Sequence, residues 1–111
     1  MQKRALKEVK MRQAEYRIEA DTIKIKLPEE LDHSNSVDIR KIADSGIYSG
    51  KAKNVEFDFS ATSFMDSSGI GMIMGRYRLV EPLGGRVIIT GAKGNIERII
   101  KLSGLHKIVG E

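Results

Sequence analysis

The chain reads Val55-Glu56-Phe57-Asp58-Phe59 and, after a short gap, Phe64-Met65-Asp66-Ser67-Ser68-Gly69-Ile70-Gly71, and this stretch decides the fold. Its first part alternates apolar and polar residues, which predicts a strand. In its second part Asp66 and two serines stand directly before an apolar run, which is typical of a helix N-cap, because their oxygens accept hydrogen bonds from the first N–H groups of a helix. Ser68 is therefore expected where a strand ends and a helix begins. That position is exposed, offers N–H donors and tolerates negative charge, so it suits a phosphate, either bound or covalently attached.

A hairpin and a helix are predicted before this stretch. Apolar and polar residues alternate over 16–20 and again over 23–27, and Asp21-Thr22 between them predicts a tight turn. Pro28 ends the second strand because it lacks an N–H for the ladder. Ser34-Asn35-Ser36 then offers three candidate caps for an amphipathic helix. The apolar face of that helix consists of Ile39, Ile42, Ala43 and Gly46.

Alternating strands and helices are predicted after the stretch. The helix that follows Asp66 should end near Val80, and residues 86–90 read as a buried strand. Asn95 is expected to cap a third helix that Gly104 ends in a left-handed conformation, with Leu105 as its apolar contact, before a last short strand at 107–109. This order predicts one α/β domain with a mixed, mostly parallel sheet of about five strands, an N-terminal β-hairpin, and helices after strands 2, 3 and 4.

Composition limits the classes of function. The chain has 111 residues, no cysteine and two histidines, so we expect no disulfide, no metal site and no cofactor. Residues 1–17 contain six basic and two acidic side chains, whereas the remainder contains 13 of each. The net charge of +4 thus belongs to a basic N-terminal leader, taken as residues 1–14, and the domain at 15–111 offers no basic surface for nucleic acid by count. No apolar run approaches the ~20 residues that cross a membrane, so a cytoplasmic location is the default.

Several motifs together resemble one family. They are Phe57-Asp58-Phe59-Ser60, the Asp66-Ser67-Ser68-Gly69 core with its flanks, Gly75-Arg76-Tyr77, Leu31-Asp32-His33 after the second strand, Gly84-Gly85, and the run 102–108. Over residues 15–110 the sequence is similar to the anti-sigma factor antagonists of the STAS domain family, most of all to its sporulation members. The resemblance reinforces the expected α/β fold.

The resemblance implies a bacterial partner-switching protein. Such proteins bind an anti-sigma factor that is also a serine kinase, and so release a sigma factor of sporulation or stress response. The kinase phosphorylates the serine that matches Ser68, which ends binding, and a metal-dependent serine phosphatase restores it. The loop around Asp32 belongs to the interface of the family, although Pro28-Glu29-Glu30 replaces the usual Gly-rich approach to it. The positions expected to contact the partner are Asp32, His33, Asp66, Ser67, Gly69, Ile70 and Met72.

Other interpretations stay open from the sequence. Ser68 could be only a capping hydroxyl, Asp66 and Ser67 read as the cap and its support, and His33 reads as a surface or capping side chain. Met72 and Leu79, on the helix face opposite its sheet-facing residues, could meet a partner or a neighbouring helix. A hydrolase using Ser67 or Ser68 is not expected, because neither histidine stands in a recognisable catalytic pattern. A non-switching STAS module, such as a stressosome scaffold or a transporter subunit, is the alternative function.

Overall fold

The structure is a computed structural model and describes residues 14–110. Its main sheet has four strands in the order β1-β2-β4-β6, in which β1 and β2 are antiparallel and the other neighbours are parallel. A second, two-stranded parallel sheet pairs β3 with β5. The strands are β1 (Glu15–Glu19), β2 (Thr22–Lys26), β3 (Glu30–Leu31), β4 (Asn54–Asp58), β5 (Phe64–Met65) and β6 (Val87–Thr90). The helices are α2 (His33–Tyr48), α3 (Ser67–Val80) and α4 (Gly94–Ser103), with 3-10 turns η1 (Glu81–Leu83) and η2 (Leu105–Lys107). The expected α/β fold, hairpin and three helices are confirmed.

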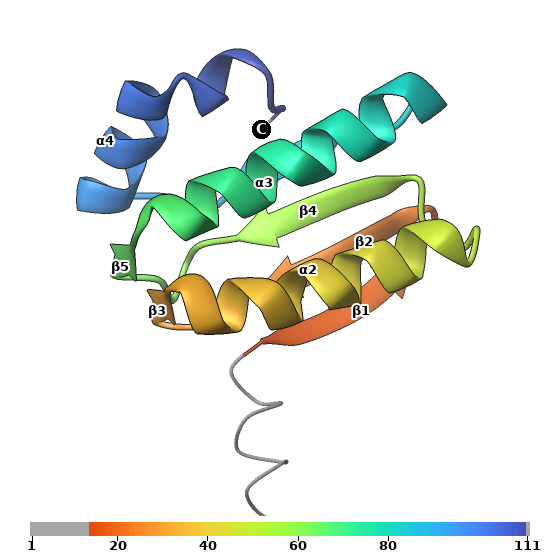
Figure 1. Cartoon of the computed structure of the whole chain (residues 1–111), viewed down its shortest axis with the longest axis horizontal. Helices are drawn as coiled ribbons and strands as arrows, with labels where there is room; N and C mark the ends of the chain where they lie inside the picture. Colours follow the sequence, from red (N-terminus) through yellow and green to blue (C-terminus); the bar gives the residue numbers. More distant parts are fainter. Residues whose placement is uncertain (1–13, 111) are drawn as a thin grey trace, which may run out of the picture.

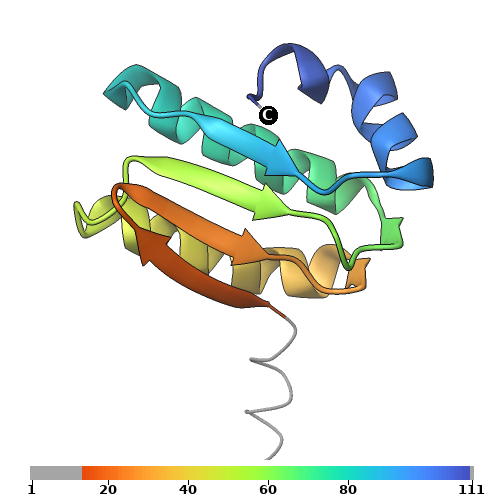
Figure 2. The same ribbon diagram turned by 180° about the vertical axis from the view of Figure 1, so that it is seen from behind.

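Two helices cover one face of the main sheet. α2 and α3 run side by side across it, while α4 lies near β5 at the far end of the molecule (Figure 1). From behind, the strands stand in front with no helix over them (Figure 2). The alternation in β4 follows from this arrangement, since Val55 and Phe57 are fully buried beneath the helices and the residues that alternate with them are only partly buried. The core therefore lies between the sheet and the α2–α3 pair.

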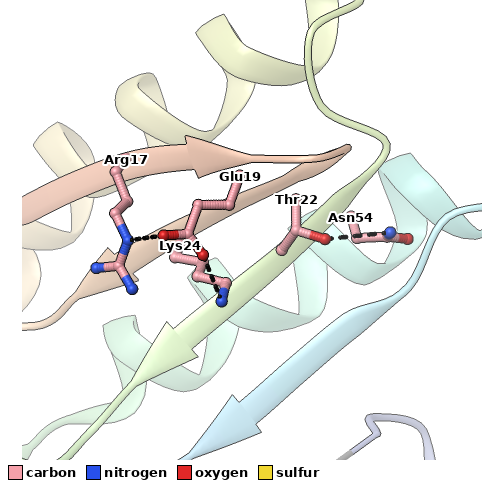
Figure 3. Close-up of polar contacts among 5 residues, drawn as sticks. All are labelled: Arg17, Glu19, Thr22, Lys24 and Asn54. Atoms are coloured by element: carbon pink, nitrogen blue, oxygen red, sulfur yellow. Dashed lines mark hydrogen bonds and ion pairs between the residues drawn. The ribbon is translucent and has the colours of Figure 1, made fainter.

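The open face of the sheet carries charged and polar side chains. The Glu19 carboxylate accepts a hydrogen bond from Arg17 Nε at 2.7 Å and forms an ion pair with Lys24 Nζ at 2.9 Å (Figure 3). These two contacts, that from Lys24 first, lower the pKa of the Glu19 carboxyl. Beside them Asn54 Nδ2 donates to Thr22 Oγ1 at 3.4 Å. Exposed pairs of this kind stabilise a fold very little. Their charged groups make the side of the sheet opposite α2 and α3 polar.

Two predicted helix starts are wrong in detail. α2 begins at His33, with Asp32 as its N-cap, so none of the residues 34–36 is the cap. α4 begins at Gly94 after Lys93, which makes no side-chain capping bond, so Asn95 does not cap it. The predicted end of α4 is confirmed, because Gly104 has a left-handed φ of 83° and Leu105 is buried.

The predicted last strand at 107–109 is also wrong. Leu105–Lys107 form a 3-10 turn, and the backbone N–H groups of Ile108 and Val109 both donate to the carbonyl of Leu105. Those donors are consequently unavailable to a ladder, and only Gly110 bridges to Ile88. The main sheet thus has four strands instead of about five. Between residues 14 and 110 we find no helix with both the length and the apolar character needed to cross a bilayer.

Candidate functional site

The two-stranded sheet brings the starts of two helices together. Leu31 of β3 pairs with Met65 of β5, and Asp66 N donates to the Leu31 carbonyl at 3.2 Å. Each of these strands is followed at once by an aspartate that caps a helix, Asp32 for α2 and Asp66 for α3. Because the strands are parallel and in register, the two helices begin side by side and run in the same direction (Figure 1). The N–H groups of both first turns thus emerge on one end of the domain.

Asp66 fixes the backbone at the start of α3. Its Oδ1 accepts the N–H of Ser68 at 2.8 Å, and its carbonyl accepts the N–H of Gly69 at 3.1 Å. The expected capping role of Asp66 is therefore present in the structure. The Asp66 carboxylate is thus bonded to the backbone, and it holds Ser68 at the second position of the helix. Ser68 is partly exposed, and its hydroxyl faces α2.

Asp32 fixes the start of α2 through a reciprocal pair of bonds. Its Oδ1 accepts the N–H of Asn35 at 3.0 Å, and Asn35 Oδ1 accepts the N–H of Asp32 at 2.9 Å, which forms a capping box. Asn35 Nδ2 also donates to the carbonyl of Glu30. Asn35 is a site residue whose role sequence reasoning missed, although the Asp-x-x-Asn spacing carries the signal. The box makes the loop around Asp32 a defined structure instead of a solvated turn.

Removing this box should destabilise the fold. Asp32→Ala leaves the first N–H groups of α2 without an acceptor, so we expect the free energy of unfolding to fall by about 1–2 kcal/mol, measured by urea denaturation. Asp32→Asn is the matched control, because asparagine caps helices equally well. Equal losses for both variants would show that the charge, and not the capping bond, stabilises this helix start.

Ser68 meets His33 across the two helices. Ser68 Oγ and His33 Nδ1 lie 3.4 Å apart, and the two residues are 35 positions apart in the chain. A serine beside a histidine raises the question of a hydrolase. Such an enzyme needs a third group that orients the imidazole, and in residues 14–110 no hydrogen bond joins a carboxylate to His33. Within the described residues the structure thus shows a hydroxyl beside an imidazole and no carboxylate that orients the imidazole.

A shallow groove extends from this pair between the helices, and we call it the α2–α3 groove. Its volume is about 340 Å³. It is lined by His33, Ser36, Val37 and Arg40 of α2 and by Ser68, Gly71, Met72, Gly75 and Arg76 of α3. A Cβ added at Gly71 or Gly75 would meet no neighbouring atom within 4 Å, so these two glycines leave the α3 side of the groove open. A partner's backbone could therefore approach α3 closely.

The groove is positively charged overall. Arg40 and Arg76 line it, and Arg76 Nε lies 3.0 Å from Asp44 Oδ1. Neither atom of that ion pair has a hydrogen-bond partner of good geometry among residues 14–110, and Arg76 Nη1 is also buried without one. Burial lowers the pKa of the Arg76 guanidinium, the charge of Asp44 opposes this, and repulsion from Arg40 adds to it. An acidic group entering the groove would relieve that repulsion.

The predicted contact residues fall into two groups. Asp32, His33, Asp66, Ser67 and Ile70 lie with Ser68 at the joined helix starts and are exposed or partly exposed. Gly69 and Met72 are buried. Met72, 6% exposed, belongs to the core, which favours the neighbouring-helix alternative for it. A Cβ on Gly69 would lie 2.7 Å from Met65 Cγ and 2.9 Å from Leu31 Cδ2, so this glycine lets α3 pack onto the short sheet. The roles of all these residues in binding stay predictions.

Comparison with known proteins agrees with the geometry. The model of the STAS domain matches residues 13–110. The chain belongs to the STAS domain family. The resemblance that the motifs indicate is thus confirmed, and the match covers the predicted domain almost from end to end. The predicted basic leader, residues 1–14, lies outside the described residues except for Ala14.

Within the STAS family, the chain is similar to several anti-sigma factor antagonists. An anti-sigma F factor antagonist of Paenibacillus polymyxa is 34% identical over 85 residues, which cover 77% of this chain and 73% of the relative. The phosphorylated form of the Bacillus cell fate determinant SpoIIAA is 31% identical, with a TM-score of 0.73 over 86% of this chain and 87% of that one. The unphosphorylated form of the anti-sigma factor antagonist SpoIIAA is 30% identical, with a TM-score of 0.71 over 80% and 82%. The likeness to anti-sigma F factor antagonists and to SpoIIAA is therefore also confirmed.

Proposed function

We propose that this STAS protein is an anti-sigma factor antagonist that works by partner switching in the cytoplasm. It binds an anti-sigma factor with serine kinase activity, which frees a sigma factor, and phosphorylation of Ser68 ends the binding. The observation that carries this proposal is the position of Ser68, partly exposed at the joined helix starts and at the mouth of the α2–α3 groove. Relatives named as anti-sigma F factor antagonists, and a SpoIIAA solved in both phosphorylation states, support it.

The fold can accept a phosphate at this position. A phosphoserine carries about −1.5 to −2 charges at neutral pH. The N-terminus of a helix carries a partial positive charge, and here two helices begin side by side next to Ser68. The added charge is therefore favoured by both helix starts, and we expect this gain to outweigh its repulsion from the capping carboxylates of Asp32 and Asp66. The switch needs no change of fold.

The same charge disrupts a close interface. A partner that packs over Ser68, Ser67 and Ile70 would remove the phosphate from water and press it against its own surface. Without cations on the partner to receive it, the phosphate loses solvation and repels nearby acidic groups. Binding and phosphorylation thus exclude each other at one surface.

The chemistry of the switch belongs to the partners. The kinase transfers the γ-phosphoryl group of ATP, so a bond forms between Ser68 Oγ and phosphorus, the bond to the β-phosphate oxygen breaks, and ADP leaves while the hydroxyl proton passes to a base of the kinase. A metal-dependent serine phosphatase returns the hydroxyl by hydrolysis. This chain supplies the acceptor, held by Asp66, and we assign it no catalytic role of its own.

Incubation with the cognate anti-sigma factor kinase and ATP should add one phosphate to the chain, at Ser68. Intact-mass and fragment mass spectrometry locates it. Ser68→Ala should take up no phosphate. Ser67→Ala should still take up one, because Ser67 is the first residue of α3 and the proposal does not make its hydroxyl the acceptor. Phosphate at another residue, or none at all, would contradict the proposal and favour a STAS module that does not switch.

A further inference from the structure

We propose that His33 is the positioning residue for the phosphate on Ser68, and that its imidazole holds the phosphate oxygens by a hydrogen bond and a charge pair across the mouth of the α2–α3 groove. This inference rests on the proposed function, in which Ser68 is the residue that is phosphorylated. It concerns the phosphorylated state of the chain and adds a second residue, from another helix, to the switch.

The geometry of the unmodified pair already aims the two groups at each other. Ser68 Oγ lies 3.4 Å from His33 Nδ1, a long hydrogen bond in which the hydroxyl can donate to a neutral imidazole. Phosphorylation replaces the hydroxyl hydrogen and adds three acceptor oxygens that reach beyond Oγ. The direction of donation then reverses, since the dianionic phosphate only accepts and the ring nitrogen must donate. A protonated imidazole donates from both nitrogens and also carries the opposite charge.

The capped helix starts fix the positions of both His33 and Ser68. His33 is the first residue of α2 after its cap Asp32, and Ser68 is the second residue of α3 after its cap Asp66. The two capping carboxylates each accept a backbone N–H of their own helix. Their charges are thereby directed into the helix starts, which leaves the imidazole as the side chain that faces Ser68 Oγ.

The charged groups around His33 favour the same arrangement. On α2 these are the cap Asp32 and Arg40, which lines the groove, and on α3 they are the cap Asp66 and Arg76, which also lines the groove. Asp44 is paired with Arg76, and Asp32 lies at the cap of α2. A phosphate at the mouth of the groove therefore meets a positive field from Arg40 in addition to the direct contact with His33.

The test measures the phosphate itself. Phosphoserine is incorporated at position 68 during synthesis of the full chain, so that the sample does not depend on any kinase, and its 31P resonance is followed from pH 4.5 to 8. The second pKa of a phosphoserine lies near 6. A nearby cation favours the dianion and lowers that pKa, so the wild-type phosphate should titrate about half a pH unit lower than in His33→Gln.

Three controls separate a direct contact from a general field. His106→Gln removes the only other histidine of the chain, which is exposed on η2, and should leave the titration at the wild-type position. Arg40→Gln removes a groove charge but not the hydrogen bond, and should shift the titration by less than His33→Gln does. About 1 M salt should move the wild-type curve toward that of His33→Gln, a readout that needs no variant to fold.

The inference is overturned if the phosphate titrates alike in wild type and His33→Gln, if Arg40→Gln reproduces the whole shift, or if salt leaves the wild-type curve unchanged. These results are independent of the kinase experiment. A kinase that ignores Ser68 would contradict the proposed function while the titration still reports on His33.

Discussion

Ser68→Asp is expected to weaken binding of this STAS protein to its anti-sigma factor by about 100-fold or more. The aspartate places a permanent negative charge at the joined helix starts, where a partner must cover Ser68 to bind. Burying a charge without a counter-ion costs several kcal/mol, and about 2.8 kcal/mol already corresponds to a factor of 100. Isothermal titration calorimetry with the purified anti-sigma factor measures the difference directly.

The controls for this variant separate charge from folding. Ser68→Ala should bind like the wild type and should lose only the response to kinase and ATP. Ser45→Asp adds the same charge to an exposed position of α2, away from its N-terminus, and should change affinity little. Circular dichroism should show an intact fold for all three variants, since an acidic residue suits the first turn of α3. Equal affinity of wild type and Ser68→Asp would contradict the proposed switch.

The sequence predicted the place of Ser68 because the signals that place it are local. The alternation of β4 and the acidic cap before an apolar run are both short-range patterns, and α3 begins where they predict. His33 lies 35 positions earlier, and its contact with Ser68 depends on the pairing of β3 with β5. Each of these strands has only two residues, which is too short for alternation to reveal. The neighbouring helix starts could therefore not be predicted from the residues alone.

The details that the sequence predicted wrongly share a cause. The cap of α2 is Asp32 and not one of the three polar residues that follow it, because the choice among such neighbours depends on where the chain leaves β3. The segment 107–109 has the apolar character of a strand, but the buried Leu105 begins a 3-10 turn at Leu105–Lys107, and its carbonyl accepts the N–H groups of Ile108 and Val109. In both places tertiary packing decides between local alternatives of similar energy.

Two glycines of α3 are expected to respond to alanine in opposite directions. At Gly69 an added Cβ would lie 2.7 Å from Met65 Cγ and 2.9 Å from Leu31 Cδ2, and Leu31 is fully buried. At Gly71, two positions later and exposed, it would meet nothing within 4 Å. Gly69→Ala should therefore lower the free energy of unfolding by about 1–3 kcal/mol through overpacking. Gly71→Ala should raise it by about 0.5–1 kcal/mol, because alanine favours the helix.

Thermal unfolding resolves this pair, since 1 kcal/mol moves the midpoint by about 4–8 °C in a domain of this size. Comparing Gly69→Ala with Gly71→Ala also tests whether Gly69, the last residue of the Asp66-Ser67-Ser68-Gly69 motif, serves the fold or the binding of a partner. A destabilised Gly69→Ala assigns that glycine to the contact between α3 and the β3–β5 sheet, which sets the distance between Ser68 and His33. If Gly69→Ala were as stable as Gly71→Ala, the glycine would be free of packing constraints and its place in the motif would have to come from the partner.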